Sequence, residues 1–276
     1  MAESELLEFH RAIDWSDSTK GTYVYTAILY RDGASGGRFN MRAFRPGMWK
    51  ADVDLEHFRA EMKCQQAGPC PGAGDFGGEP LLIDIAELFR KLQPSFMSVK
   101  PQGDLYFKKM EIGLCHDAAF HKTSRDEIMS EANVLEELRC WAHPHIVKYL
   151  GCMVEHSHIV GFVLESYKQT LFQRCLSKET PLKVGRCIAQ VAAARAHLQD
   201  MGYCHNDDTS RNIMLKEDNT AVLIDFDWCQ RMGEISLRGT AAGWCSDASR
   251  ASVVKNDCLG LARLENFLRK SFGANE

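Results

Sequence analysis

The stretch Tyr203–Asp227 reads YCHNDDTSRNIMLKEDNTAVLIDFD. It places Asp207 and Asn212 in one polar loop, and a short turn and an apolar strand lead from that loop to a further aspartate, Asp225. In phosphoryl transfer, one carboxylate orients the attacking hydroxyl and accepts its proton, while a carboxylate and an amide hold Mg²⁺ against the phosphates. The stretch therefore predicts a metal-dependent phosphoryl-transfer site.

The composition of the chain is that of an ordinary globular protein. Its 276 residues are 45% hydrophobic and 25% charged, which suffices for one or two domains with a buried core. The formal net charge is −4, so no overall positive field argues for nucleic acid or an anionic membrane as the main partner. These numbers carry no information on the oligomeric state.

The cysteines indicate a reducing compartment, because there are 11 of them and none forms a CxxC pair. The acidic N-terminus lacks the apolar core of a signal peptide, and no apolar run approaches the roughly 18 residues that span a bilayer. We therefore expect free thiols in a cytoplasmic or nuclear protein. A zinc site at His143, His145, His156 and His158 is the alternative, although no Cys/His spacing matches a known site.

Residues 1–94 are expected to form an N-terminal extension with a β-hairpin, helices and a Gly/Pro-rich loop at 67–78. β-branched and aromatic residues favour a hairpin, and Gly33–Gly37 lies too far before Lys108 to be a phosphate-binding loop for it, so we interpret these glycines as the hairpin turn. The expected strands are Thr22–Tyr30 and Arg38–Phe44, and the expected helices are Asp52–Cys64 and Pro80–Leu92.

From Ser95 onward the expected elements are a mixture of strands and helices. The clearest helix is Ser124–Leu138, where Ser124 and Glu127 have the spacing of an N-terminal capping box. An alanine-rich helix, Val184–Met201, ends at Gly202. The other expected elements are strands at Phe96–Val99, Asp104–Lys108, Ile146–Leu150, Ile159–Leu164 and Ala221–Phe226 and a last helix at Asn256–Leu268.

The loop from His205 to Asn212 resembles the catalytic loop H-R-D-x-x-x-x-N of the protein kinases, and Asp225-Phe-Asp follows at the place of their D-F-G. The resemblance covers roughly residues 95–273 and is closest to the divergent fungal-type protein-kinase-like domains. It implies that Asp207 is the catalytic base, that Asn212 and Asp225 bind magnesium, and that His205 is structural.

Two further motifs support the same resemblance. Glu131 and the HPHIV sequence that begins at His143 resemble the kinase C-helix and the strand entry after it. Glu131 then corresponds to the glutamate that pairs with a strand lysine. Lys108, at the end of LYFK, is the better candidate for that lysine because of the alternation in the strand, and Lys109 remains the competing choice.

The segment VGFVLESY at 160–167 resembles the strand that joins the two kinase lobes. The resemblance implies that Leu164 controls access behind the adenine and that Glu165, Ser166 and Tyr167 offer backbone hydrogen bonds to it. A core strand followed by an ordinary loop is the plainer interpretation, and the two are compatible.

The resemblance implies a two-lobed α+β fold, with a β-rich small lobe at 95–167 and a shortened, mainly helical large lobe at 168–276. Arg238–Trp244 (RGTAAGW) resembles the end of a kinase activation segment, in which Thr240 helps to position the substrate. Asp257 corresponds to the aspartate that anchors the catalytic-loop backbone. Whether a partner chain completes the large lobe stays open.

The expected function is an ATP- and Mg²⁺-dependent transfer of phosphate to a hydroxyl, with serine or threonine of a protein substrate as the acceptor. Three departures from the kinase pattern leave alternatives: Asn206 replaces the loop arginine, Thr209 the loop lysine and Asp227 the D-F-G glycine. A nucleotide-binding or scaffolding pseudokinase is one alternative. A small-molecule kinase of the aminoglycoside or choline type is the other.

Overall fold

The computed structural model describes residues 5–14, 22–31, 39–44, 81–83, 89–100, 102–109, 118–177, 182–235 and 251–273. The chain divides into two compact units. The first unit comprises Met1–Lys91, Glu111–Arg125 and His156–His158, and the second comprises Leu92–Met110, Asp126–Glu155 and Ile159–Glu276.

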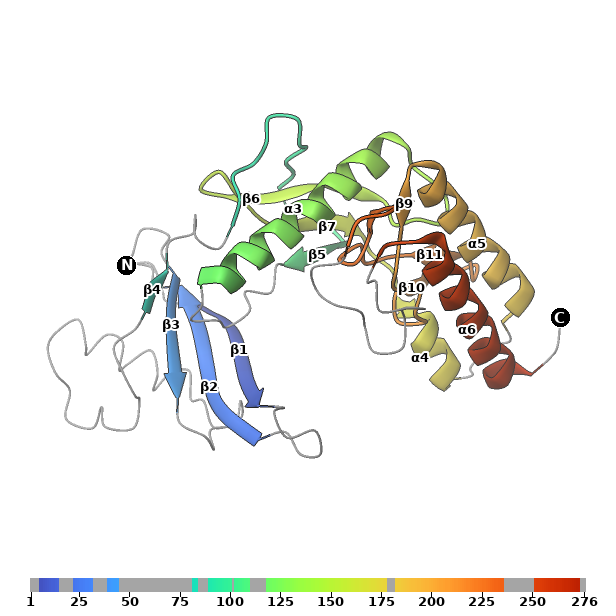
Figure 1. Ribbon diagram of the computed structural model, residues 1–276, viewed down its shortest axis with the longest axis horizontal. Coiled ribbons are helices and arrows are strands. Elements are labelled where there is room, and N and C mark those ends of the chain that lie inside the picture. Colours follow the sequence, from blue (N-terminus) through green and yellow to red (C-terminus); the bar gives the residue numbers. More distant parts are fainter. Residues whose placement is uncertain are drawn as a thin grey trace, which may run out of the picture. The chain divides into compact units, whose positions relative to one another are not determined.

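The first unit contains a four-stranded sheet in the order β1-β2-β3-β4, with antiparallel neighbours (Figure 1). Its strands are β1 (Glu5–Asp14), β2 (Thr22–Arg31), β3 (Phe39–Phe44) and β4 (Leu81–Ile83). The pairing of β2 with β3 confirms the predicted hairpin strands.

The sequence analysis missed one strand of this unit and predicted a helix where the structure has another strand. β1 was not anticipated, because its stretch ELLEFHRAID carries charges throughout and only one β-branched residue. A helix was expected at 80–92, but Leu81–Ile83 is a strand, since a short apolar run fits either element. The expected helix at 52–64, the loop at 67–78 and the glycine turn at 33–37 lie outside the described residues.

The second unit begins with a three-stranded sheet in the order β5-β7-β6. These strands are β5 (Leu105–Lys109), β6 (Tyr149–Glu155) and β7 (His158–Glu165), and β5 runs antiparallel to β7. β7 is the central strand, and its apolar sequence HIVGFVLE is buried along most of its length. The stretch 96–99, expected as a strand, forms only an isolated bridge between Ser98 and Cys152.

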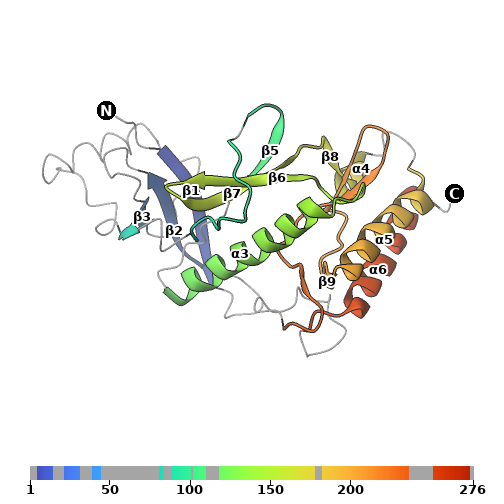
Figure 2. The same cartoon turned by 90° about the horizontal axis from the view of Figure 1, so that it is seen from above.

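Helix α3 (Ala118–Cys140) runs beside this sheet in both views (Figure 2). Ala132, Leu135 and Leu138 are buried at the spacing of one helix face. The Tyr149 hydroxyl of β6 donates to Glu136 Oε1 at 2.9 Å, which fixes the helix against the sheet. Because α3 begins at Ala118, Ser124 lies inside the helix and the predicted capping box is wrong.

The remainder of the second unit is mainly helical. Helices α5 (Val184–Asp200) and α6 (Val254–Phe272) pack side by side, and Leu198, Leu264 and Leu268 are buried between and around them (Figure 1). α5 ends as predicted, with Gly202 at a φ of 85°. The other elements are α4 (Leu171–Ser177), β8 (Gln169–Thr170), β9 (Tyr203–Cys204), β10 (Ile213–Leu215), β11 (Ala221–Leu223) and β12 (Gln230–Arg231).

β10 and β11 form a short antiparallel hairpin to which β8 adds a third strand. β9, which precedes the polar loop 205–212, pairs with β12 in a separate two-stranded antiparallel sheet. The loop that carries Asp207 therefore begins at β9 and ends at β10, and Asp225 is the second residue after β11. Among the described residues, no helix has the length and apolar character needed to cross a membrane.

Candidate functional site

The polar loop 205–212 is tied by its backbone to helix α6. The Asp257 carboxylate, which is 1% exposed, accepts hydrogen bonds from the amides of His205 at 3.3 Å and Asn206 at 2.9 Å. The His205 ring is fully buried, bonds the carbonyl of Ile224 at 3.1 Å and lies edge-on to Phe226. These contacts join the loop to the strand that precedes Asp225, which is the structural arrangement expected for His205.

Asn206 has a structural role that the sequence analysis missed. Its φ is 64°, in the left-handed region that asparagine tolerates better than most residues. Its Nδ2 atom donates to the carbonyls of Cys204 and Trp228 and to Ser252 Oγ, at 3.2, 3.0 and 2.9 Å. The residue that replaces the kinase arginine therefore connects three parts of the loop region.

Arg195 of α5 is a second residue that the sequence analysis missed. Its Nε atom lies 3.0 Å from Asp208 Oδ2 and 3.9 Å from Asp257 Oδ2, and both aspartates are buried. Burial raises the pKa of Asp208 to about 6 even though His205 and Arg195 counteract it. The helical spacing of the buried residues Val191, Arg195 and Leu198 places Arg195 on the inner face, and that periodicity could have revealed it.

Asp257→Ala is expected to lower the free energy of unfolding by about 2–4 kcal/mol, because two loop amides lose their acceptor. Asp257→Asn should cost less, since the amide oxygen can still accept one of these bonds. Denaturant unfolding would measure both, with the exposed Glu265→Gln on the same helix as the control. Equal stability of all three variants would contradict the anchoring contact.

The loop brings Asp207 and Asn212 together. Asn212 Nδ2 donates to Asp207 Oδ2 at 2.7 Å and to the Asp207 carbonyl at 3.1 Å, which leaves its Oδ1 atom as the available metal donor. Burial raises the pKa of Asp207, with contributions from Asp225 and Asp227. The Ile224 amide donates to the Asn212 carbonyl at 2.9 Å, so the loop and the Asp225 segment are adjacent.

Lys108 of β5 is surrounded by three carboxylates. Its Nζ atom lies 2.7 Å from Glu131 Oε1, 2.7 Å from Asp225 Oδ1 and 2.5 Å from Asp227 Oδ1. Burial alone would lower the pKa of Lys108, but Glu131, Asp227 and Asp225 together raise it. Burial also raises the pKa of Glu131 despite the nearby lysine. The structure thus pairs Lys108, rather than Lys109, with Glu131.

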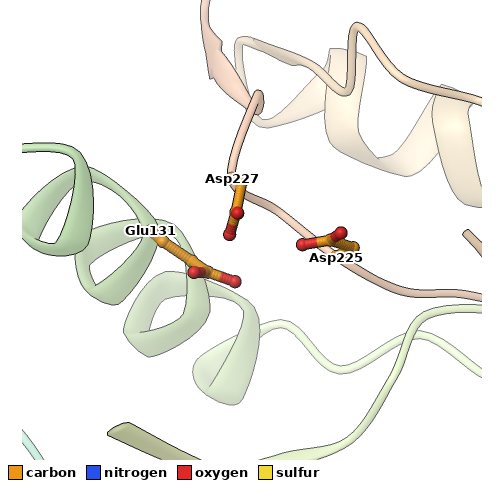
Figure 3. A group of neighbouring side chains, drawn as sticks. All are labelled: Glu131, Asp225 and Asp227. Atoms are coloured by element: carbon orange, nitrogen blue, oxygen red, sulfur yellow. The ribbon is translucent and has the colours of Figure 1, made fainter. Parts of the chain in front are cut away.

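The carboxylates of Glu131, Asp225 and Asp227 point toward one another (Figure 3). One oxygen of each lies within 4.8 Å of the others. Mg²⁺ prefers oxygen donors and usually takes one or two protein carboxylates together with substrate phosphates. Asp225 and the amide oxygen of Asn212 fit that donor set. Their two segments are adjacent because the Ile224 amide, next to Asp225, donates to the Asn212 carbonyl. Asp225 also has a φ of 66°, which is rare for an aspartate and costs backbone strain.

A cavity of about 370 Å³ lies between β7, β5 and the β10–β11 hairpin. Its lining includes Lys108, Leu164, Glu165, Tyr167 and Asp225. This volume is within the range of small-ligand pockets. The cavity thus joins the strand lysine, a metal-ligand candidate and most of the expected adenine-binding segment in one site.

The expected hinge residues differ in their placement. Leu164 and Tyr167 line the cavity, whereas Ser166 does not belong to its lining. The Glu165 amide already donates to the Lys148 carbonyl at 3.0 Å, so it is committed to the fold instead of to a base. The segment Arg238–Trp244 with Thr240 lies outside the described residues.

The comparison with known proteins agrees with this arrangement. The family model described as "Protein kinase domain" matches residues 113–243. The tyrosine-protein kinase ZAP-70 of Mus musculus is 26% identical to this chain over 136 residues, which are 49% of this chain and 21% of the relative. The chain therefore spans about a fifth of the length of that curated relative.

Residues 113–243 are thus similar to a protein kinase domain, and the described strands and helices form a mixed α+β fold. This confirms the family resemblance and the fold class predicted from the sequence. Lys108 precedes the matched residues, so its assignment rests on its contacts with Glu131 and Asp225. The finer likeness to fungal-type domains stays a prediction.

Proposed function

We propose that this chain binds ATP with Mg²⁺ and transfers the γ-phosphate to a serine or threonine hydroxyl of a protein. The observation that supports this proposal best is that Lys108 and Asp225 both line the 370 Å³ cavity, while Lys108 contacts both Glu131 and Asp225. Apolar packing has no need for these groups together, and like charges this close repel one another without a cation.

Each residue has a role that its contacts support. Glu131 holds Lys108, whose ammonium would bind the nucleotide phosphates. Asn212 holds the Asp207 carboxylate, which would orient the acceptor hydroxyl and take its proton. Asp225 and the Asn212 amide oxygen would hold Mg²⁺. Bound Mg²⁺ neutralises charge on the phosphates during transfer.

Thr209 stands where kinases have a lysine, so another cation must serve the transferred phosphate. Arg211 is the nearest candidate in the loop, and its guanidinium lies 4.5 Å from the centre of the Phe172 ring. Stacking on an aromatic face restrains a guanidinium without neutralising it. We propose that Arg211 supplies this charge.

The dependence of kcat/KM on pH should reflect the protonation of the Asp207 carboxylate. Because burial raises its pKa, the acid limb should lie above the pKa of about 3.9 of a free aspartate. Activity requires the deprotonated carboxylate, so it should rise with pH through that raised pKa. A pH profile measures this limb, and a midpoint at or below the free value would contradict Asp207 as the base.

Asp227→Gly is expected to lower the KM for ATP, because one carboxylate no longer competes with the phosphates for Lys108. A hydrogen bond to a charged group contributes about 1.5 kcal/mol, which corresponds to about tenfold. Asp227→Asn should have a smaller effect in the same direction. If both variants lose activity while binding ATP normally, Asp227 belongs to the required apparatus and competition is the wrong explanation.

The proposal is tested by thermal stability with ATP, with Mg²⁺ and with both. A ligand at 100 times its Kd stabilises by about 2.7 kcal/mol, so Mg-ATP should shift the transition clearly. No shift would overturn ATP binding and with it the proposed function. A shift without transfer of labelled γ-phosphate to any acceptor would favour the pseudokinase instead.

The acceptor is tested by comparing peptides that contain serine, threonine or tyrosine with aminoglycoside and choline-like compounds. The named relative is a tyrosine-protein kinase, so tyrosine is the competing protein acceptor. Labelling of serine or threonine peptides supports the proposal. Labelling of tyrosine peptides only would replace serine and threonine with tyrosine as the acceptor. Labelling of small molecules only would favour the small-molecule kinase, the alternative that Asp227 beside Lys108 supports.

A further inference from the structure

A second cavity, which we call the rear cavity, lies between the end of α3, residues 142–149, Glu165 at the end of β7, and Lys216. It measures about 320 Å³, and its apolar lining consists of Leu138, Ala142, Pro144, Ile146 and Val147. Arg139, Lys148 and Lys216 also line it. None of these cations has a role in the phosphotransfer site described above. The rear cavity therefore combines an apolar wall with a cationic rim.

Two of the three cations have no acidic partner in the part of the chain that the structure describes. Within the described residues, neither Lys148 nor Lys216 forms an ion pair or a side-chain hydrogen bond. Arg139 bonds Glu136 through Nε alone, at 2.8 Å, so its terminal nitrogens remain available. A cavity with unpaired cations around an apolar wall is complementary to an anion attached to an apolar group.

The other polar groups in the lining cancel only part of this charge. Glu165 is the acidic residue of the lining, and it shares a hydrogen bond with the Tyr167 hydroxyl. His143 stacks on His197 at 4.9 Å, and burial and the neighbouring histidines lower its pKa. The lining thus holds three cationic side chains against the single carboxylate of Glu165, which leaves an excess of positive charge.

A large aromatic residue is next in the sequence to one of the residues that line the rear cavity. Trp141 directly precedes Ala142 in the chain, and it is 66% exposed. The Nε2 of His197 donates to its carbonyl at 2.7 Å, which fixes the backbone that carries it. Exposed tryptophan and arginine are the residues that most often dominate the energy of protein interfaces. An extended segment is thus a better match for this surface than a small free anion.

We propose that the rear cavity is a docking site for an acidic peptide segment of a partner protein, with Asp or Glu side chains flanking an aliphatic or aromatic residue. The carboxylates bind Lys148, Lys216 and the terminal nitrogens of Arg139, and the apolar side chain enters between them. Glu165 and Val147 line both this cavity and the 370 Å³ cavity, so the occupant lies directly behind the adenine-binding segment proposed above.

The test is a selection from a random-sequence peptide library on the full chain. The enriched peptides should carry an excess of Asp and Glu next to Leu, Ile or Phe. A synthetic peptide of the enriched sequence should bind the double variant Lys148→Glu with Lys216→Glu at least about tenfold more weakly. The matched control reverses two exposed lysines outside the lining, Lys183→Glu with Lys255→Glu, and should bind the peptide like the parent chain.

Several outcomes would overturn the docking site. These are no enrichment, enrichment of uncharged or basic peptides, and equal binding by the parent chain and the Lys148/Lys216 variant. Displacement of the peptide by inorganic phosphate at constant ionic strength would identify a small-anion site instead. The Mg-ATP shift in thermal stability is measured on the same variants. A variant that keeps this shift but does not bind the peptide is folded, so the docking residues are then the cause. Absence of the shift in the parent chain would be a failure of the proposed function and not of the docking site.

Discussion

Asp207→Asn is expected to lower the rate of phosphate transfer by a factor of about 10²–10⁴, the usual contribution of a positioned general base. The substitution preserves the size of the side chain and removes the group that accepts the proton. Asn212, the hydrogen-bond partner of Asp207, stays in place. Single-turnover transfer of labelled γ-phosphate at saturating Mg-ATP measures the chemical step without a contribution from nucleotide binding.

The affinity for Mg-ATP should change little in the same variant, because Asp207 is not among the residues that line the nucleotide cavity. A loss of transfer with normal binding is the signature of an interaction made in the transition state only. Asp200→Asn on α5 is the control, since this aspartate is exposed and lies outside the loop. If Asp207→Asn and Asp200→Asn transfer phosphate equally fast, Asp207 is not the base.

The catalytic loop could be predicted because its information is local. Asp207, Asn212 and Asp225 lie in one short stretch of sequence. Only a tight hairpin of β10 and β11 separates the loop from Asp225, so these three residues must lie close together in the fold. The Lys108–Glu131 contact was predictable only through the resemblance to kinases, since its partners come from different elements. The choice between Lys108 and Lys109 needed the structure, because one residue of strand register reverses the side that each side chain faces.

Other features of the site depend on contacts that sequence patterns do not encode. Asn206 and Asp227 look like losses when they are compared with the kinase pattern. In the fold, Asn206 connects Cys204, Trp228 and Ser252, and Asp227 reaches Lys108. Comparison with the kinase motif shows which residue is missing. Only the structure shows which groups the residue in its place contacts.

Lys108→Met is expected to impair both stability and transfer. It leaves Glu131, which is 5% exposed, and two aspartates close together without their cation. Breaking a fully buried pair costs about 3–5 kcal/mol, and since the aspartate side chains are 35% and 30% exposed we expect a smaller loss of about 2–3 kcal/mol. Phosphate transfer should fall by about 10²–10³, as it does when one preorganised electrostatic donor is removed.

Lys109→Met is the matched control, because Lys109 is the next residue of β5 and is exposed. It should leave both stability and transfer near the parent values. Mg²⁺ alone should stabilise the Lys108→Met variant more than the parent chain, because the three carboxylates then have no other cation nearby. Thermal unfolding with and without Mg²⁺ measures this difference. If the two lysine variants behave alike, the cluster around Lys108 neither stabilises the fold nor binds the phosphates.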